Sequence, residues 1–185
     1  MLALVGESPV LSLTTPLPEV GRARSTLYQV SREVQSGSWG FNFEGGLELT
    51  PASDGRIQIP SAPYGVLRVD ATDSQTDVVT RRGLEEDDTG FFLYDRKAHS
   101  YVFPSPLDVD ITWFIPFEDL PEPAAQYIYI RAARRFQRIV LGSSEIEQLS
   151  QADEGMALMT LNSYDTAHAD YNILDEGSSL YITQR

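Results

Sequence analysis

The sequence predicts an α+β fold, in which helices from both ends of the chain form a bundle and an antiparallel β region is inserted between them. The prolines divide the chain into zones: none falls between Pro18 and Pro51, eight fall from Pro51 to Pro123, and none follows. Because proline ends helices and avoids central strands, this spacing indicates helix, then turn-rich strands, then helix. Apolar residues recur at helical spacing in the outer zones and at every second position in the middle zone.

The first helix is expected from Gly21 to Ser36. Its apolar residues follow one another at spacings of four, three and four, which is the stripe of an amphipathic helix: Ala23, Leu27, Val30 and Val34. Gly37 follows as a stop signal.

Strands are expected between Phe41 and Phe117, where apolar and polar residues alternate. The alternating groups are Phe41/Phe43, Leu47/Leu49, Ile57/Ile59, Leu67/Val69 and Val109/Ile111/Trp113. Gly45-Gly46 and Asp54-Gly55 supply turns between them. Since no helical pattern interrupts these strands, we expect an antiparallel meander rather than a parallel α/β sheet.

Two further helices are expected near the end of the chain. The second runs from about Pro121 to Leu141, with prolines and an acid in its first turn. The third begins at Ser144, in a capping box, and runs to about Tyr171. We expect the apolar stripe of the first helix to pack against the face of the second that carries Phe136, Ile139 and Val140.

These elements predict a discontinuous helical domain (residues 1–40 and 118–171), an inserted β region (41–117) and an extended C-terminal arm (172–185). The chain has 185 residues, of which 42% are hydrophobic, so it can bury a stable core without disulfides or structural metals. It has no cysteine, which excludes disulfides, thiolate metal sites and cysteine nucleophiles. No apolar run approaches the roughly 18 residues of a membrane span, so we expect a soluble product of the cytoplasm.

The net charge of −13, from 27 acids and 14 bases, bears on nucleic-acid binding. Only one of those bases is a lysine, Lys97. So acidic a surface repels phosphate, which argues against a protein that grips DNA or RNA. The acidic surface is compatible with a protein that nucleic acid passes without being bound.

Few residues are candidates for catalysis. His99 and His168 are the only histidines, and without an HExxH pattern or a third ligand neither predicts a metal site; no cofactor is expected. The run Glu85–Asp88, together with Trp39 and Trp113 as sugar platforms, leaves open an alternative as a glycan-binding or glycan-hydrolysing protein. We favour a solvated hairpin tip for the acidic run and core positions for the tryptophans.

Four arginines share one face of the second helix, at spacings of three, one and three: Arg131, Arg134, Arg135 and Arg138. This face is a candidate phosphate site, as in a DNA-binding module. However, residues 139–184 contain eight acids and no Lys or Arg. We therefore favour pairing of the arginines with this acidic segment, either within the chain or between copies of it.

Six short motifs, in register, resemble tail tubular protein A, the family of ring-forming adaptors between portal and tail nozzle in short-tailed bacteriophages. They are LVGESPVLSL at residues 4–13, QSGSWGFN at 35–42, LYDR at 93–96, DLPE at 119–122, AARRFQ at 132–137 and DYNILD at 170–175. Each motif alone is weak, but their common order and spacing over nearly the whole chain are specific.

The resemblance implies a structural virion protein, made in the host cytoplasm, without enzymatic activity or cofactor. It implies a homo-oligomeric ring of twelve copies that binds the portal protein, the tail nozzle (tubular protein B) and the tail fibre. Genomic DNA would pass through its bore without sequence-specific binding, and the acidic composition suits that passage. The four arginines then become candidates for contacts between subunits, and the arm becomes a candidate portal-docking segment through Asn172, Ile173, Leu174, Leu180, Tyr181 and Ile182.

Overall fold

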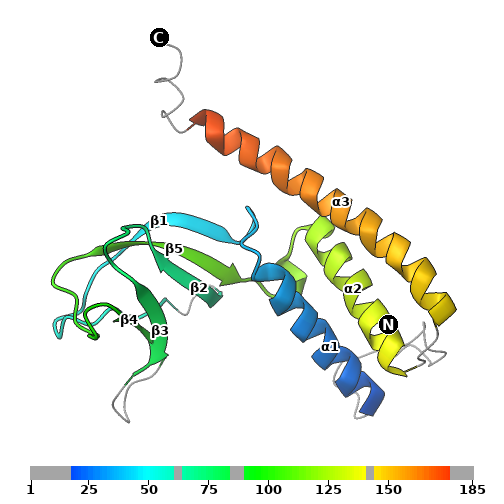
Figure 1. The fold of residues 1–185 in the computed structure, drawn as a ribbon, viewed down its shortest axis with the longest axis horizontal. Coiled ribbons are helices and arrows are strands. Elements are labelled where there is room, and N and C mark those ends of the chain that lie inside the picture. Colours follow the sequence, from blue (N-terminus) through cyan, green and yellow to red (C-terminus); the bar gives the residue numbers. More distant parts are fainter. Residues whose placement is uncertain (1–17, 61–63, 84–89, 141–143, 176–185) are drawn as a thin grey trace. The chain divides into compact units, whose positions relative to one another are not determined.

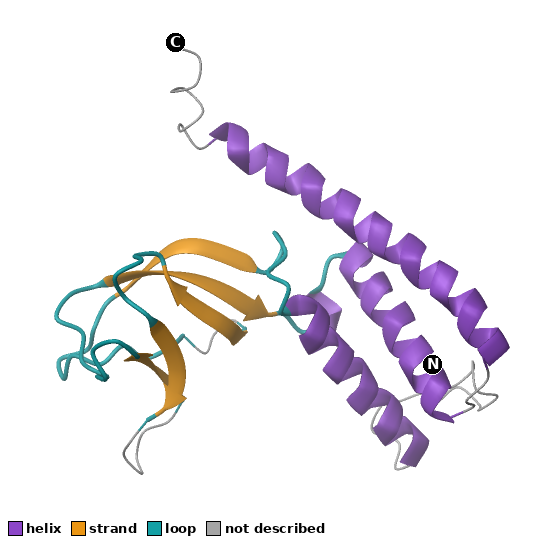
Figure 2. Cartoon of the chain, in the orientation of Figure 1, coloured by secondary structure: helices purple, strands orange, loops and turns teal. Residues whose placement is uncertain are grey.

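The computed structural model describes residues 18–60, 64–83, 90–140 and 144–175. The chain forms two compact units, a helical unit (Met1–Val34 with Phe117–Arg185) and a β unit (Gln35–Pro116). Within the described residues, one helix precedes five strands and two long helices follow them (Figures 1 and 2). The α+β fold class predicted from the sequence is therefore confirmed.

The helical unit contains α1 (Pro18–Gln35), whose last residue belongs to the β unit, a short 3-10 turn η2 (Phe117–Asp119), α2 (Glu122–Val140) and α3 (Ser144–Asp175). α1 starts three residues before the expected Gly21, because Pro18 has the backbone angle of a first helical turn and Glu19 complements the helix dipole. In Figure 1, α2 lies between α1 and α3. α3 extends past the expected end at Tyr171.

The core of the helical unit is formed by the apolar faces of its three helices. The buried residues are Val20, Ala23, Val30 and Val34 of α1, Ala124, Tyr127, Ile128, Ala132, Ala133 and Phe136 of α2, and Ala157 and Leu161 of α3. At about 100° per residue, those of α2 cover more than half of its circumference, as expected for a middle helix.

One expected core position of the helical unit is wrong. Ile139 is 64% exposed on the last turn of α2, whereas Leu27 of α1 is partly buried. The side chain of Val140 lies outside the described residues. The buried face of α2 runs through Ile128 and Phe136. Ile139 is apolar but lies outside that face, so its hydrophobicity alone did not predict its burial correctly.

The β unit contains two antiparallel sheets. The first has the order β1-β5-β2 and consists of β1 (Phe43–Leu49), β5 (Leu107–Phe114) and β2 (Gly65–Ala71). The second pairs β3 (Val78–Arg82) with β4 (Phe91–Asp95). The antiparallel pairing was predicted, but the meander order was wrong, because the last strand lies between the first two.

The core of the β unit takes residues from both sheets and from the segments before β2 and before β5: Leu49, Ile57, Ile59, Val69, Val78, Leu93, Phe103, Val109 and Ile111. Ile57 and Ile59 are buried as the alternation predicted. Their segment makes isolated bridges, Arg56 with Val102 and Gln58 with Phe92, rather than a full strand.

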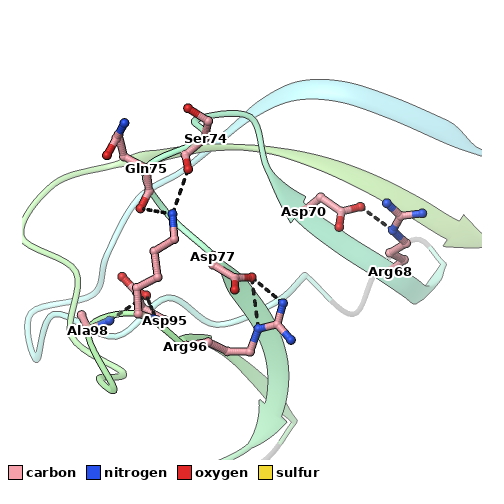
Figure 3. A network of polar contacts seen from close by, with 9 residues as sticks. Arg68, Asp70, Ser74, Gln75, Asp77, Asp95, Arg96 and Ala98 are labelled. Carbon is pink, nitrogen blue, oxygen red and sulfur yellow. Dashed lines mark hydrogen bonds and ion pairs between the residues drawn. The ribbon is translucent and has the colours of Figure 1, made fainter.

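A polar network fixes the turn after β4 (Figure 3). Asp95 accepts hydrogen bonds from the backbone N–H groups of Lys97 and Ala98, at 2.7 and 3.0 Å. The ammonium of Lys97 donates to the carbonyls of Ser74 and Gln75, both at 2.9 Å. The single lysine of the chain thus joins two turns of the β unit, which explains its presence in a chain otherwise basic through arginine.

Candidate functional site

Three of the four arginines predicted from the sequence, Arg131, Arg134 and Arg135, contact carboxylates on the two neighbouring helices. Glu33 of α1 accepts hydrogen bonds from Arg131 and from Arg135, the second at 2.7 Å. Glu154 of α3 accepts from Arg134 at 2.5 Å and lies 3.7 Å from Arg131. These ion pairs hold all three helices of the helical unit in one layer.

The arginines also enclose a small hollow. An open cavity of about 150 Å³ is lined by Arg131, Arg134, Arg135, Arg138 and Glu154. Guanidinium groups bind carboxylate and phosphate oxygens in paired, planar geometry. The hollow therefore has the chemistry of an oxyanion site, and the Glu154 carboxylate already forms part of its lining.

The ion pairs shift the ionisation of their members. Partial burial by itself raises the pKa of Glu33, but the hydrogen bond from Arg135 and the charge of Arg131 outweigh it, so the pKa of Glu33 lies below its ordinary value. Burial lowers the pKa of Arg131, and the hydrogen bond with the Tyr127 hydroxyl (2.7 Å) together with the charge of Glu33 raise it above its ordinary value. Both groups are held charged at neutral pH.

We expect Glu33→Gln to lower the free energy of unfolding by at most about 1 kcal/mol at neutral pH, because the carboxylate is partly exposed and its ion pairs are screened. Since the folded-state pKa of Glu33 is lowered, its stabilisation is complete above the ordinary carboxyl pKa and is lost as pH falls through the folded-state pKa. Urea unfolding between pH 7 and pH 3 should therefore bring variant and wild type together at acidic pH. Glu48→Gln, an exposed acid of β1, is the control. A gap that does not change with pH would contradict this role of Glu33.

A second polar cluster lies in the β unit and was not predicted as a site. The buried amide of Gln35 donates to the Ile115 carbonyl at 3.0 Å and accepts from the Ile115 N–H at 2.8 Å. The amide of Asn42 donates to the carbonyls of Gln35 and Trp113, both at 2.8 Å, and accepts from the Trp39 N–H at 2.9 Å. We call these contacts the Gln35–Asn42 network. They give residues 35–42, one of the six motifs, a structural role.

The structure changes the residue at which the expected C-terminal arm begins. Asn172, Ile173 and Leu174 are part of α3, so the boundary at Tyr171 is wrong. The sequence from Asp170 to Asp175 has neither proline nor glycine, and nothing in it stops a helix. Leu180, Tyr181 and Ile182 lie outside the described residues.

The other candidate residues do not converge on one site. The run Glu85–Asp88 lies outside the described residues. Trp39 stacks on Phe41, with ring centroids 6.5 Å apart, and the indole of Trp113 donates to Glu44 at 3.0 Å. The His168 ring contacts the ring of Tyr164, at a centroid distance of 4.1 Å.

Metal-ligand clusters and membrane-spanning helices are two further features that would point to other classes of function. Within the described part of the chain, no group of three or more His, Cys, Asp or Glu residues is arranged to hold a metal ion. Likewise, none of the helices there is both long and apolar enough to cross a membrane.

By its fold the chain is an α+β protein, and among its described helices α2 is ion-paired to both α1 and α3. The family model described as Tail tubular protein matches residues 1–171, so the chain belongs to this family of phage tail proteins. It is 34% identical over 127 residues to Tail tubular protein A of Klebsiella phage KP34. That match covers 69% of this chain and 62% of the relative. The protein is therefore a structural component of the virion tail, as the motifs predicted.

Proposed function

We propose that the protein is the adaptor ring between portal and tail nozzle, with twelve copies completing the DNA channel. Membership of the tail tubular protein family over residues 1–171 carries this proposal. In it, the portal, the nozzle (tubular protein B) and a tail fibre are the partners. The role is structural and requires neither catalysis nor a cofactor.

The charge distribution supports passage of DNA without binding. The chain carries a net charge of −13, which repels the phosphate backbone. Arg131, Arg134 and Arg135 are engaged by Glu33 and Glu154 within the same chain. We propose that the arginine hollow supports contacts inside the ring rather than contacts with DNA.

We also propose that the end of the chain docks on the portal. α3 would deliver residues 172–174 as its last helical turn, and Leu180, Tyr181 and Ile182 would follow as an alternating, β-prone stretch. Such a stretch can add a strand to a partner's sheet edge.

Deleting residues from Gly177 onward should leave the melting temperature unchanged and weaken co-sedimentation with purified portal. The reason is that the deleted stretch follows the last described helix and would act only in the assembly. Full-length protein with Ser178→Ala is the matched control. Portal binding by the truncated chain at full strength would contradict the docking role, and loss of its thermal transition would assign the segment to the core.

A further inference from the structure

The outward face of α3 has no charged side chain, although the chain is strongly acidic. Helical periodicity places the following exposed residues on this α3 outer face: Ala152, Gly155, Met156, Met159, Asn162, Ser163 and Thr166. Met156 and Met159 are 68% and 71% exposed. Of the acids of this stretch, Asp153 lies at an edge of this face, whereas Glu154 and Asp165 lie on the opposite, partly buried side of the helix.

The hydroxyl groups on and beside this face are satisfied within the helix. Thr160, Ser163 and Thr166 each donate to the backbone carbonyl four residues earlier, at 3.1, 2.9 and 2.8 Å. The usual cost of burying a polar surface is that donors are left unpaired. Covering this face would leave none of these donors unpaired. Methionine side chains adapt to irregular contact surfaces. The face has the properties of a helix surface that becomes buried.

The outward face of α1 is aromatic and basic. Its exposed centre contains Gly21, Ser25, Tyr28 and Arg32, with Arg22 and Arg24 beside them. Tyr28 is 53% exposed, and the Arg32 guanidinium lies over its ring, 5.8 Å from the centroid. Of the two acids of α1, Glu33 is engaged by the arginines of α2. α1 therefore presents an aromatic, basic surface, whereas α3 contains acids and no Lys or Arg.

We infer that the α3 outer face packs against the outward face of α1 in a second copy of this chain. This inference rests on the proposed ring and names the surfaces that close it. α1 and α3 flank α2 on opposite sides, so such a contact is head-to-tail and repeats from copy to copy, as a ring requires. A symmetric α3–α3 contact is disfavoured because α3 contains acids and no Lys or Arg, so two copies of it would repel each other.

Cysteine crosslinking tests the contact directly, because the chain has no cysteine of its own. A Met159→Cys protein mixed with a Ser25→Cys protein should give a crosslinked heterodimer with a short bis-maleimide reagent. The control replaces Ser25→Cys by Val102→Cys, a residue 57% exposed in the β unit, and should give only background. Heterodimer at background level would overturn the inference, as would efficient crosslinking of Met159→Cys to itself.

Sedimentation separates this inference from the proposed ring. Met159→Glu should weaken self-association at least about tenfold, because a carboxylate at a contact between apolar surfaces loses its hydration. Ile139→Glu, at an exposed position of α2, should leave it unchanged. If the wild type assembles and Met159→Glu assembles equally well, the α3–α1 contact is wrong and the ring stands. If the wild type stays monomeric at every concentration, both are wrong.

Discussion

Replacing Asn42 with alanine should lower the free energy of unfolding by about 3 kcal/mol, since each buried polar group left without a partner costs about 1–3 kcal/mol. Asn42 is 2% exposed, and its amide serves the Trp39 N–H and the carbonyls of Gln35 and Trp113. Alanine removes all three hydrogen bonds and leaves a space at the first turn after α1. Urea unfolding monitored by tryptophan fluorescence measures the loss, because Trp39 and Trp113 both lie in this region.

The matched control for that prediction is Gln75→Ala, an exposed amide of the β unit. A surface change of this kind usually alters stability by less than about 0.5 kcal/mol. If Asn42→Ala were as mild as Gln75→Ala, the Gln35–Asn42 network would have no structural importance, and the motif at residues 35–42 would need another explanation.

Phe136→Ala should destabilise the protein by about 3–5 kcal/mol, which is the usual cost of removing a fully buried phenylalanine. Phe136 is 1% exposed and is the largest fully buried side chain of the described residues. It lies on α2 one residue after Arg135, so its loss removes packing beside the arginine cluster. Thermal unfolding followed by helical circular dichroism measures the effect.

Ile139→Ala is the matched control, since this residue lies three positions further along α2 and is 64% exposed. We expect a change below about 0.5 kcal/mol for it. Similar losses for Phe136→Ala and Ile139→Ala would show that the buried face of α2 is wrongly assigned.

Much of the fold could be predicted from local signals, and the exceptions have physical reasons. The stripe through Ala23, Val30 and Val34 identified the buried face of α1. The strands β3 and β4 were not predicted as separate elements, because Val78–Arg82 and Phe91–Asp95 do not alternate. The order β1-β5-β2 depends on pairing between residues far apart in the sequence, which local patterns do not specify.

Only part of the candidate site could be predicted from the sequence. The spacing of Arg131, Arg134 and Arg135 is by itself enough to place them on one face of a helix. Their partner Glu33 is separated from Arg131 by 98 positions, and only the packing of α1 beside α2 brings the two together. Gln35 and Asn42 belong to a family motif, but buried amides give no periodic signal. Their role follows from their hydrogen bonds alone.

Electron microscopy of the purified protein, with and without purified portal, tests the proposed adaptor role most directly. We predict closed rings of twelve subunits seated coaxially on the portal, with an open central channel. A sample in which the protein remains monomeric and the portal stays bare would contradict that role.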